Sequence, residues 1–425
     1  MISIKKLVRK SDIRYDKVVN ACLSHEVIVP LEVAGRECSV KISPNDVVKE
    51  GEIIATDRVS GFNIHSPVPG VVDSVYEHIM PDGKLTPCVK IRLKGEFSFL
   101  GKIKKEADYK KFSQSQLTRI IATKGISNTF SGTVPLIDEM ANPNNVPRNL
   151  IVRLYDGDPT CCIDGFVTHR FFDKVYIGAL LTAKAMDAKS VIFVTDEHLE
   201  PPTPPADVDL GIEVHFSPMN ISYYQCAEKK EIIQIIMHSK LKKSATDLSF
   251  DDLAIDSVTA LSVFEAVCYG KPVLDRYVLV SGDAVRTPEI FNVKIGTPIE
   301  NLLRECSGFK FAPDKVVING VFKGTAIDNI KTPIAEYVKS VCCFKNGSWS
   351  GTQTTECINC GKCHYVCPVG IYPDKLYHAF VNKKKIAKEY IESAKICCDC
   401  KVCNSVCPSR LSIFQAIREL QKVGK

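Results

Sequence analysis

The chain has 425 residues and a net charge of +6, and charged residues make up 24% of it. This length exceeds what one hydrophobic core supports, so about three or four domains are expected. The mean hydropathy of +0.00 is typical of a soluble globular chain, and nucleic-acid binding is not indicated, because no known motif or aromatic pattern accompanies the positive charge.

Membrane and secretory segments are not apparent in the sequence. No apolar run reaches the roughly 18 residues of a spanning helix, and the first ten residues lack the apolar core of a signal peptide. Of the 19 cysteines, nine crowd into residues 357–407 and the others are scattered, which favours a reducing compartment over a disulfide framework. We therefore expect a cytoplasmic protein.

Residues 1–100 are predicted to form a β domain. Short apolar and polar alternations between Gly, Pro and Asp turns run through residues 26–92, as in a small sandwich or barrel. Residues 44–55 and 65–72 resemble the barrel-sandwich hybrid domain of biotinyl and lipoyl carriers. Such carriers place a lysine on the hairpin tip, but none occurs in this hairpin. We expect a scaffold or docking module, with His65 as a turn residue.

Residues 101–255 are predicted to form an α/β domain. Apolar runs at 150–154 and 191–194 indicate buried strands, with an apolar helix at 175–188 between them. This order is typical of a parallel sheet with crossover helices. Further helices are expected at 113–123 and 228–240.

Ligands of such folds bind in the loops beyond the carboxyl ends of the strands, here residues 156–160 and 196–197. A nucleotide would normally be announced by a glycine-rich phosphate loop. The corresponding segment, residues 125–132, has only Gly125 and Gly132. An ordinary loop is the alternative interpretation.

A second small domain is predicted at residues 256–345. Strands at 278–282, 291–298 and 315–320 and a helix at 299–305 give a β-β-α-β order, punctuated by turn glycines. No residue of this segment indicates catalysis, and Lys323 is interpreted as a surface charge.

Residues 346–425 contain the most specific motif of the chain. The spacing C-x2-C-x2-C-x3-C-P occurs at 357–368 and again at 397–408, and it wraps four thiolates around a cubane iron–sulfur cluster. The fourth cysteine of each run usually ligates the cluster of the other run. The predicted sets are therefore Cys357, Cys360, Cys363 and Cys407 for one 4Fe-4S cluster, and Cys397, Cys400, Cys403 and Cys367 for the other.

Zinc is the alternative occupant of these runs, because paired C-x2-C units also build tetrahedral zinc sites. Zinc does not require the third cysteine or the fourth followed by proline, both of which occur twice here. Cys398 is interpreted as a spare cysteine that ligates neither cluster. Residues 375–395 between the runs have roughly helical periodicity, and the apolar stripe of Leu411, Phe414, Ile417 and Leu420 predicts a helix facing a core.

The order of these parts resembles the C subunit of the Rnf electron-transport complex over nearly the whole chain. The resemblance implies a barrel-sandwich hybrid domain, a Rossmann-like α/β domain, a β-grasp (SLBB-like) module and an α-helical ferredoxin domain. The matching segments besides the cysteine runs are residues 44–72, 223–229, 257–272, 293–298, 318–324 and 332–334. Residues 1–6 and 156–159 also resemble the A subunit of sodium-translocating NADH:quinone reductase, a resemblance that stops before Cys357.

The Rnf resemblance implies a peripheral protein on the cytoplasmic face of the inner membrane. Its partners would be the membrane subunits of the complex, ferredoxin or flavodoxin, and NAD(H). Its cofactors would be two 4Fe-4S clusters, FMN and NAD(H), in an oxidoreductase that couples electron flow between ferredoxin and NAD to ion translocation.

The flavin and nicotinamide segments depart from the family pattern. The family loop G-x-G-G-x-G-F-P becomes residues 125–132, and its acidic A-E-C-E-P segment becomes residues 155–159. The candidate contacts are Asp156, Asp158, Gly125 and Gly132, although the lost glycines remove the evident approach of backbone to phosphate. Two alternatives stay open: a docking or electron-wire subunit without its own FMN or NADH site, and a soluble cobalamin reductase-like protein.

Overall fold

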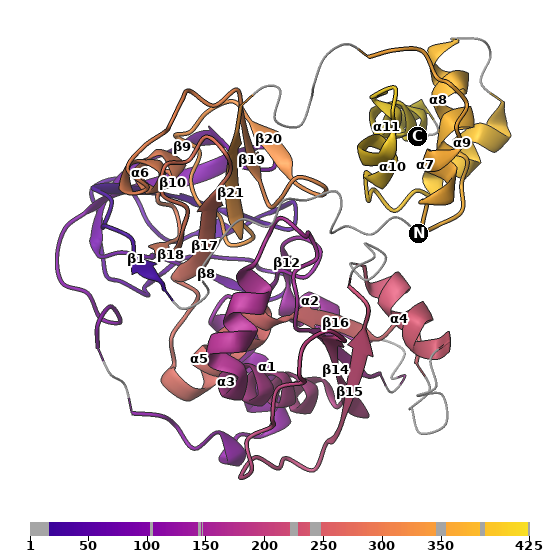
Figure 1. Cartoon of the computed structure of the whole chain (residues 1–425). Coiled ribbons are helices and arrows are strands. Elements are labelled where there is room, and N and C mark those ends of the chain that lie inside the picture. Colours follow the sequence, from indigo (N-terminus) through magenta and orange to yellow (C-terminus); the bar gives the residue numbers. More distant parts are fainter. Residues whose placement is uncertain are drawn as a thin grey trace.

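The protein is described from a computed structural model that covers residues 17–102, 105–142, 146, 148–221, 228–238, 248–345, 354–382 and 387–423. It is a mixed α/β multidomain chain with β sheets, a parallel α/β sheet and a C-terminal helical region (Figure 1). None of the helices in this described part has the length and apolar character needed to cross a bilayer.

The N-terminal β domain consists of small antiparallel sheets around one core. The larger sheet has the order β2 (Glu26–Pro30), β10 (Leu85–Leu93), β9 (Gly70–Ile79), β6 (Val47–Val48). The others are β5 (Ser39–Val40), β7 (Ile53–Thr56), β8 (Asn63–His65), and the hairpin β3 (Glu32–Val33), β4 (Arg36–Glu37). Alternate residues such as Val27, Val29 and Ile91 fill the core between them. His65 ends β8 and is 7% exposed, so it is a buried strand residue and not the predicted turn residue.

A four-stranded parallel sheet forms the centre of the α/β part, as predicted. Its order is β15 (Glu213–Met219), β14 (Ser190–Asp196), β13 (Leu150–Arg153), β16 (Leu253–Asp256). Both faces are covered, so the central strands are mostly apolar and buried at nearly every position. The chain leaves β13 toward β14 on one side, and β16 pairs with β13 on the other.

Helices cover the two faces of this sheet. One face packs against α1 (Gln114–Thr123), α3 (Ile163–Met186) and α5 (Ser257–Tyr269), and the other packs against α4 (Lys229–His238). The helix predicted at 175–188 begins earlier, since α3 is continuous from Ile163 except at Phe171, whose φ of −134° is not helical. A Cβ at Gly178 would collide with the carbonyl of Ala260, so this glycine allows α3 and α5 to touch. Two further short elements are the β11 (Ser127–Asn128), β12 (Val134–Pro135) pair and α2 (Leu136–Met140).

A six-stranded mixed sheet packs against both the α/β part and the N-terminal β domain. Its order is β1 (Val19–Asn20), β18 (Glu289–Lys294), β17 (Asp275–Ser281), β21 (Ser340–Phe344), β19 (Lys315–Ile318), β20 (Thr325–Ile327). Helix α6 (Ile299–Glu305) packs on it through Ile299, Leu302 and Leu303. The predicted β-β-α-β order is therefore present, with three additional strands. The division of the chain at residue 256 stays a prediction, and α5 beyond that point packs with the α/β core.

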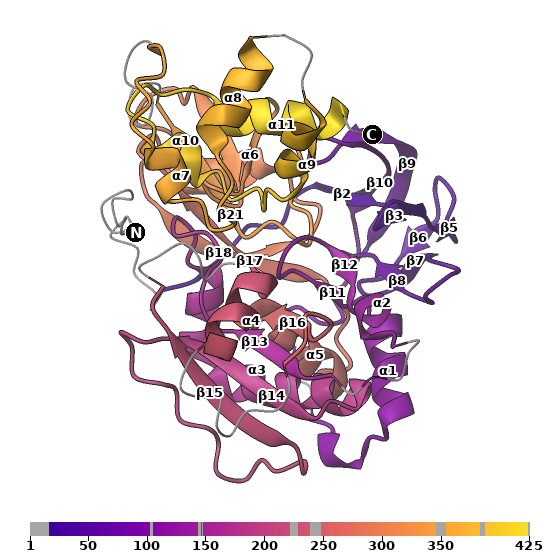
Figure 2. The same cartoon turned by 90° about the vertical axis from the view of Figure 1, so that its right-hand side faces the viewer.

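The C-terminal region is a set of short helices that repeats its own pattern. Helices α7 (Lys362–Tyr365) and α8 (Pro373–Val381) follow the first cysteine loop, and α10 (Val402–Val406) and α11 (Ile413–Val423) follow the second, with α9 (Lys388–Lys395) between. The predicted stripe on α11 is core, because Ile417 and Leu420 are fully buried. Figure 1 shows this region beside the six-stranded sheet and above α4, and Figure 2 shows it from the side that faces the viewer.

Candidate functional site

The first predicted cluster set is assembled in space. Cys357, Cys360, Cys363 and Cys407 all line one small cavity, together with Asp374, Tyr377 and residues that follow each run. Three of these thiols come from the first run and the fourth comes from the end of the second, 44 residues beyond Cys363 in the chain. The exchange of the fourth cysteine is the arrangement that the spacing predicts.

The second set is also drawn together. Cys367, Cys397 and Cys403 lie in the hydrophobic cluster of the C-terminal region that also contains Cys363. Cys400 in turn interacts with Cys403. Burial is the main cause that raises the pKa of Cys397 and of Cys403 to about 12, and the neighbouring thiols add to it. Within the described ranges, no three His, Cys, Asp or Glu side chains are arranged to hold a single metal ion.

The two cysteine loops share an unusual backbone. Left-handed φ values occur at matched positions of the first and second runs: Asn359 and Asp399, Gly361 and Lys401, Gly370 and Arg410. Four of these six residues are not glycine, whereas the rest of the described chain has five such non-glycine residues in all. Because such a conformation is costly for residues other than glycine, its repetition at matched positions shows that the two loops follow the same backbone path.

The second loop contacts the six-stranded-sheet part. Phe322, 2% exposed, packs against Cys400, Val402 and Val406, and Lys401 Nζ donates to the carbonyl of Gly324 at 2.9 Å. The first loop is the outer one, since Cys360 is exposed and Ile358 is 65% exposed. The two cysteine sets therefore differ in position: one lies near the surface and the other lies against the body of the protein.

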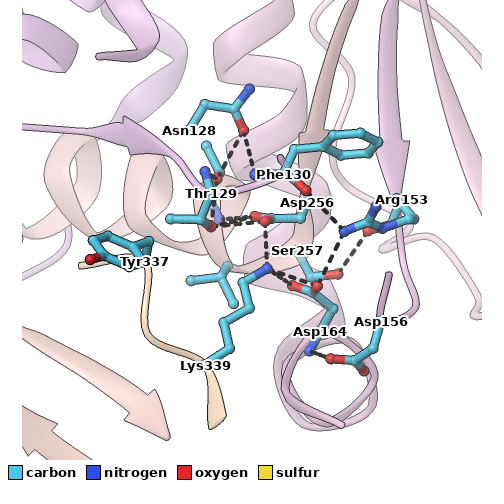
Figure 3. A network of polar contacts seen from close by, with 12 residues as sticks. Asn128, Thr129, Phe130, Arg153, Asp156, Asp164, Asp256, Ser257, Tyr337 and Lys339 are labelled. Carbon is cyan, nitrogen blue, oxygen red and sulfur yellow. Dashed lines mark hydrogen bonds and ion pairs between the residues drawn. The ribbon is translucent and has the colours of Figure 1, made fainter. Parts of the chain in front are cut away.

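An ion network fills the carboxyl edge of the parallel sheet (Figure 3). Lys339, from the segment before β21, donates to Asp164 at 2.8 and 2.9 Å and to Asp256 at 2.6 Å. Arg153 ends β13 and lies 3.6 Å from Asp164. Both carboxylates are essentially inaccessible to solvent, with side-chain exposures of 1% and 0%.

Burial and the local charges set the protonation of this network. Burial raises the pKa of Asp164 to about 7, and the nearby carboxylates of Asp256 and Asp156 act in the same direction against Lys339. Burial would also raise the pKa of Asp256, but the ammonium of Lys339 and hydrogen bonds hold it below its usual value. Burial disfavours the charged form of Lys339, yet the two carboxylates raise its pKa. Lys339 is thus a buried cation held by buried anions.

The predicted nucleotide residues do not come together. Asp156 accepts hydrogen bonds from the backbone N–H groups of Asp164 and Gly165, both at 3.0 Å, at the start of α3. Asp158 accepts from the N–H groups of Phe322 at 2.8 Å and Lys323 at 3.0 Å. Both carboxylates therefore bind backbone of this chain, and their flavin or nicotinamide role stays a prediction.

Gly125 and Gly132 lie elsewhere, on a cavity of about 360 Å³ between the β domain, the loop after α1 and the six-stranded-sheet part. His65 and Glu336 also line it. Gly125 has φ +69°, and a Cβ at this position would collide with the carbonyl of Asn63, whereas a Cβ at Gly132 would meet open space. Their separation from Asp156 and Asp158 is why the four residues do not make one site.

Sequence reasoning missed the residues of the ion network other than Asp156. A usable signal was present: Arg153 and Asp256 each end an otherwise apolar strand, and charges at the ends of buried strands need partners. The interpretation of Lys323 as a surface charge is wrong. Its side chain is 24% exposed and pairs with Glu228 beside the second cysteine loop.

Comparisons with known proteins agree with this architecture. Residues 4–96 match the RnfC barrel sandwich hybrid domain. The C subunit of the ion-translocating oxidoreductase complex of Rhodobacter capsulatus is 26% identical over 355 residues, 80% of this chain and 67% of that protein. The C subunit of the Na(+)-translocating ferredoxin:NAD(+) oxidoreductase complex of Acetobacterium woodii is 24% identical over 82% of this chain and 79% of that protein.

The fold is shared more widely. A crystal structure of NAD+-reducing [NiFe]-hydrogenase in the H2-reduced state matches with a TM-score of 0.50 and 13% identity, covering 76% of this chain and 64% of that chain. The chain combines a match to the barrel sandwich hybrid domain, a parallel α/β sheet and a cysteine-rich helical region. Over most of its length it is distantly similar to the C subunits of ion-translocating oxidoreductase (Rnf) complexes.

Proposed function

We propose that this protein is the C subunit of an Rnf-type complex, which couples electron flow between ferredoxin and NAD+ to ion translocation. The C subunits of Acetobacterium woodii and Clostridium ljungdahlii carry this activity in their names, and they align with 82% and 87% of this chain. Its partners are the membrane subunits of the complex and a ferredoxin or flavodoxin, which place it peripherally on the cytoplasmic face of the inner membrane.

In this proposal, the C-terminal region of the chain acts as an α-helical ferredoxin domain with two 4Fe-4S clusters. The observation that carries this proposal is the cavity lined by Cys357, Cys360, Cys363 and Cys407, because four thiols from two separate runs converge there. The other cluster is held by Cys367, Cys397, Cys400 and Cys403. When bound, such clusters accept and release single electrons. The six-stranded sheet with α6 serves as the β-grasp (SLBB-like) module, whose loop 320–324 seats the second cluster loop.

The residues around each cysteine set determine whether its cluster is accessible to a partner protein or shielded from water. The outer set is accessible at Cys360, where a partner protein can approach. The inner set is shielded by Phe322, which removes water from one side, and Lys401 fixes the loop to the Gly324 carbonyl. Burial and hydrogen bonds to sulfur are the quantities that set the potential of such clusters, so the two sets are expected to differ in potential.

Iron counting on anaerobically reconstituted chain tests the ligand sets. About eight irons per chain are expected from two cubanes. Cys407→Ser and Cys357→Ser should each remove the same half of the iron and the same reduced-state EPR signal, although they lie in different runs. Cys367→Ser should remove the other signal, and Cys398→Ser is the matched control that keeps both. An iron-free wild-type chain, or loss of different signals in Cys407→Ser and Cys357→Ser, would contradict the proposal.

A further inference from the structure

The carboxyl edge of the parallel sheet is where a nucleotide would be expected in this fold. Ligands of open α/β sheets bind beyond the strand carboxyl ends at the point where the strand order reverses, which here is the edge of β13 between β14 and β16. A phosphate would also be met by the first N–H groups of the following helix, α3. The residues at this edge decide whether a flavin nucleotide fits.

The anion position at the start of α3 is already taken. The N–H groups of Asp164 and Gly165 donate to the two oxygens of the Asp156 carboxylate. This carboxylate is supplied by the loop that follows β13 and satisfies the donors that a phosphate would need. A phosphate at this helix would have to displace a half-buried, hydrogen-bonded carboxylate of the same charge sign.

The space in front of the strands is filled by side chains. The Arg153 guanidinium lies 4.1 Å from the centre of the Phe130 ring and donates to the carbonyl of Tyr155 at 3.0 Å. Thr129 Oγ1 donates to Asp256 at 2.8 Å, and Lys339 enters from the opposite side. Figure 3 shows these groups converging from the loop 128–130, from β13, from β16 and from the segment before β21.

The loop that would hold a phosphate, residues 128–130, therefore contacts the charged residues at the carboxyl ends of β13 and β16. The Phe130 ring of this loop lies over the Arg153 guanidinium, on the face where a bound planar group would otherwise stack. Thr129 of the same loop hydrogen-bonds to Asp256 and Thr259. Arg153 is 2% exposed and Asp256 is fully buried, so no solvent-filled volume separates them. FMN therefore does not fit at this edge, and the cavity of about 360 Å³ on which Gly125 and Gly132 lie is lined by none of the ion-network residues.

We infer that the chain is a flavin-free electron relay: its own ion network closes the nucleotide edge, and it exchanges only single electrons with protein partners. NADH gives up two electrons as a hydride, and a flavin is the kind of cofactor that converts a hydride into single electrons. A flavoprotein outside this chain must supply that reaction. In each step here one electron leaves a donor and reduces one cluster, with no bond made or broken. This inference rests on the proposed two-cluster function.

Two measurements on the full chain test the inference. First, FMN fluorescence is titrated with apo chain, and FMN retention is measured on a desalting column. The emission is expected to stay constant and the FMN to elute with small molecules. Second, reconstituted chain is mixed anaerobically with NADH, with and without added FMN, and then with reduced methyl viologen, a one-electron donor. NADH should leave the visible cluster absorbance unchanged, and methyl viologen should bleach it.

Retention of about one FMN per chain, or bleaching by NADH, would overturn the inference and leave the two-cluster proposal standing. A chain that incorporates no iron would overturn the two-cluster proposal, and the FMN titration on apo chain would still decide whether the edge is closed.

Discussion

Removing the Lys339 ammonium is expected to destabilise the protein strongly. In Lys339→Met the carboxylates of Asp164 and Asp256 remain buried and lose their shared cation. Breaking a buried ion pair by removing one partner costs about 3–5 kcal/mol. Two features of the network reduce the expected loss of unfolding free energy to about 3 kcal/mol, the lower end of that range. Asp256 keeps its bonds from Thr129 and from the Thr259 N–H, and Asp164 can take up a proton because its pKa is about 7.

Urea unfolding of the apo chain, followed by far-UV circular dichroism, measures this loss as a lower midpoint at an unchanged slope. Lys388→Met is the control, because Lys388 is 89% exposed and its 3.7 Å pair with Glu392 is an exposed one, worth at most about 1 kcal/mol. Adding Asp164→Asn to Lys339→Met removes one stranded carboxylate and should recover part of the stability. A Lys339→Met chain as stable as the control would refute the role given to the network.

Three further results are expected. The pKa of Asp164 is about 7 in the folded chain, against an ordinary 3.8. The stabilising contribution of protonated Asp164 is therefore present below pH 4 and is lost as pH rises toward 7, by up to about 1.4 kcal/mol per pH unit. Urea unfolding at pH 5 and 7 should show this loss in the wild type and a smaller one in Asp164→Asn. Gly125→Ala should lower stability by more than about 1 kcal/mol, because φ is positive there and the added Cβ would collide with the carbonyl of Asn63. Gly132→Ala should be neutral, and equal losses would contradict the structure. Phe322→Ala should release the second cysteine loop, seen as faster hydrogen exchange in residues 397–407 with no change around residue 28; unchanged exchange would mean that Phe322 does not hold the loop.

The two central strands of the α/β sheet and the convergence of the first cysteine set could be predicted from sequence, because both depend on local spacing. The strands at 150–154 and 191–194 are apolar runs of strand length, and the cysteine motif fixes its ligands by sequence distance. The crossing of Cys407 to the first run followed from the same motif, and the structure brings it there.

The closed edge could not be predicted in this way, because its members come from separate parts of the chain. Lys339 and Asp164 are 175 residues apart, and Lys339 and Asp256 are 83 apart. Asp156 and Asp158 looked like ligand contacts because they follow a buried strand, but which partner a loop carboxylate takes depends on tertiary packing. For Asp156 that partner is the start of α3, and for Asp158 it is a loop beyond residue 319.

The pairing of β1 with β18 has a consequence for synthesis of the protein. Lys17 bonds Glu289, 272 residues further along the chain, and Ile28 and Cys88 face a core completed by residues up to Cys343. At a translation rate of roughly 5–20 residues per second, roughly 14–54 s pass before the partner of β1 leaves the ribosome. The β domain must wait through this interval with one apolar face uncovered, so its final packing is a late, non-local step of folding.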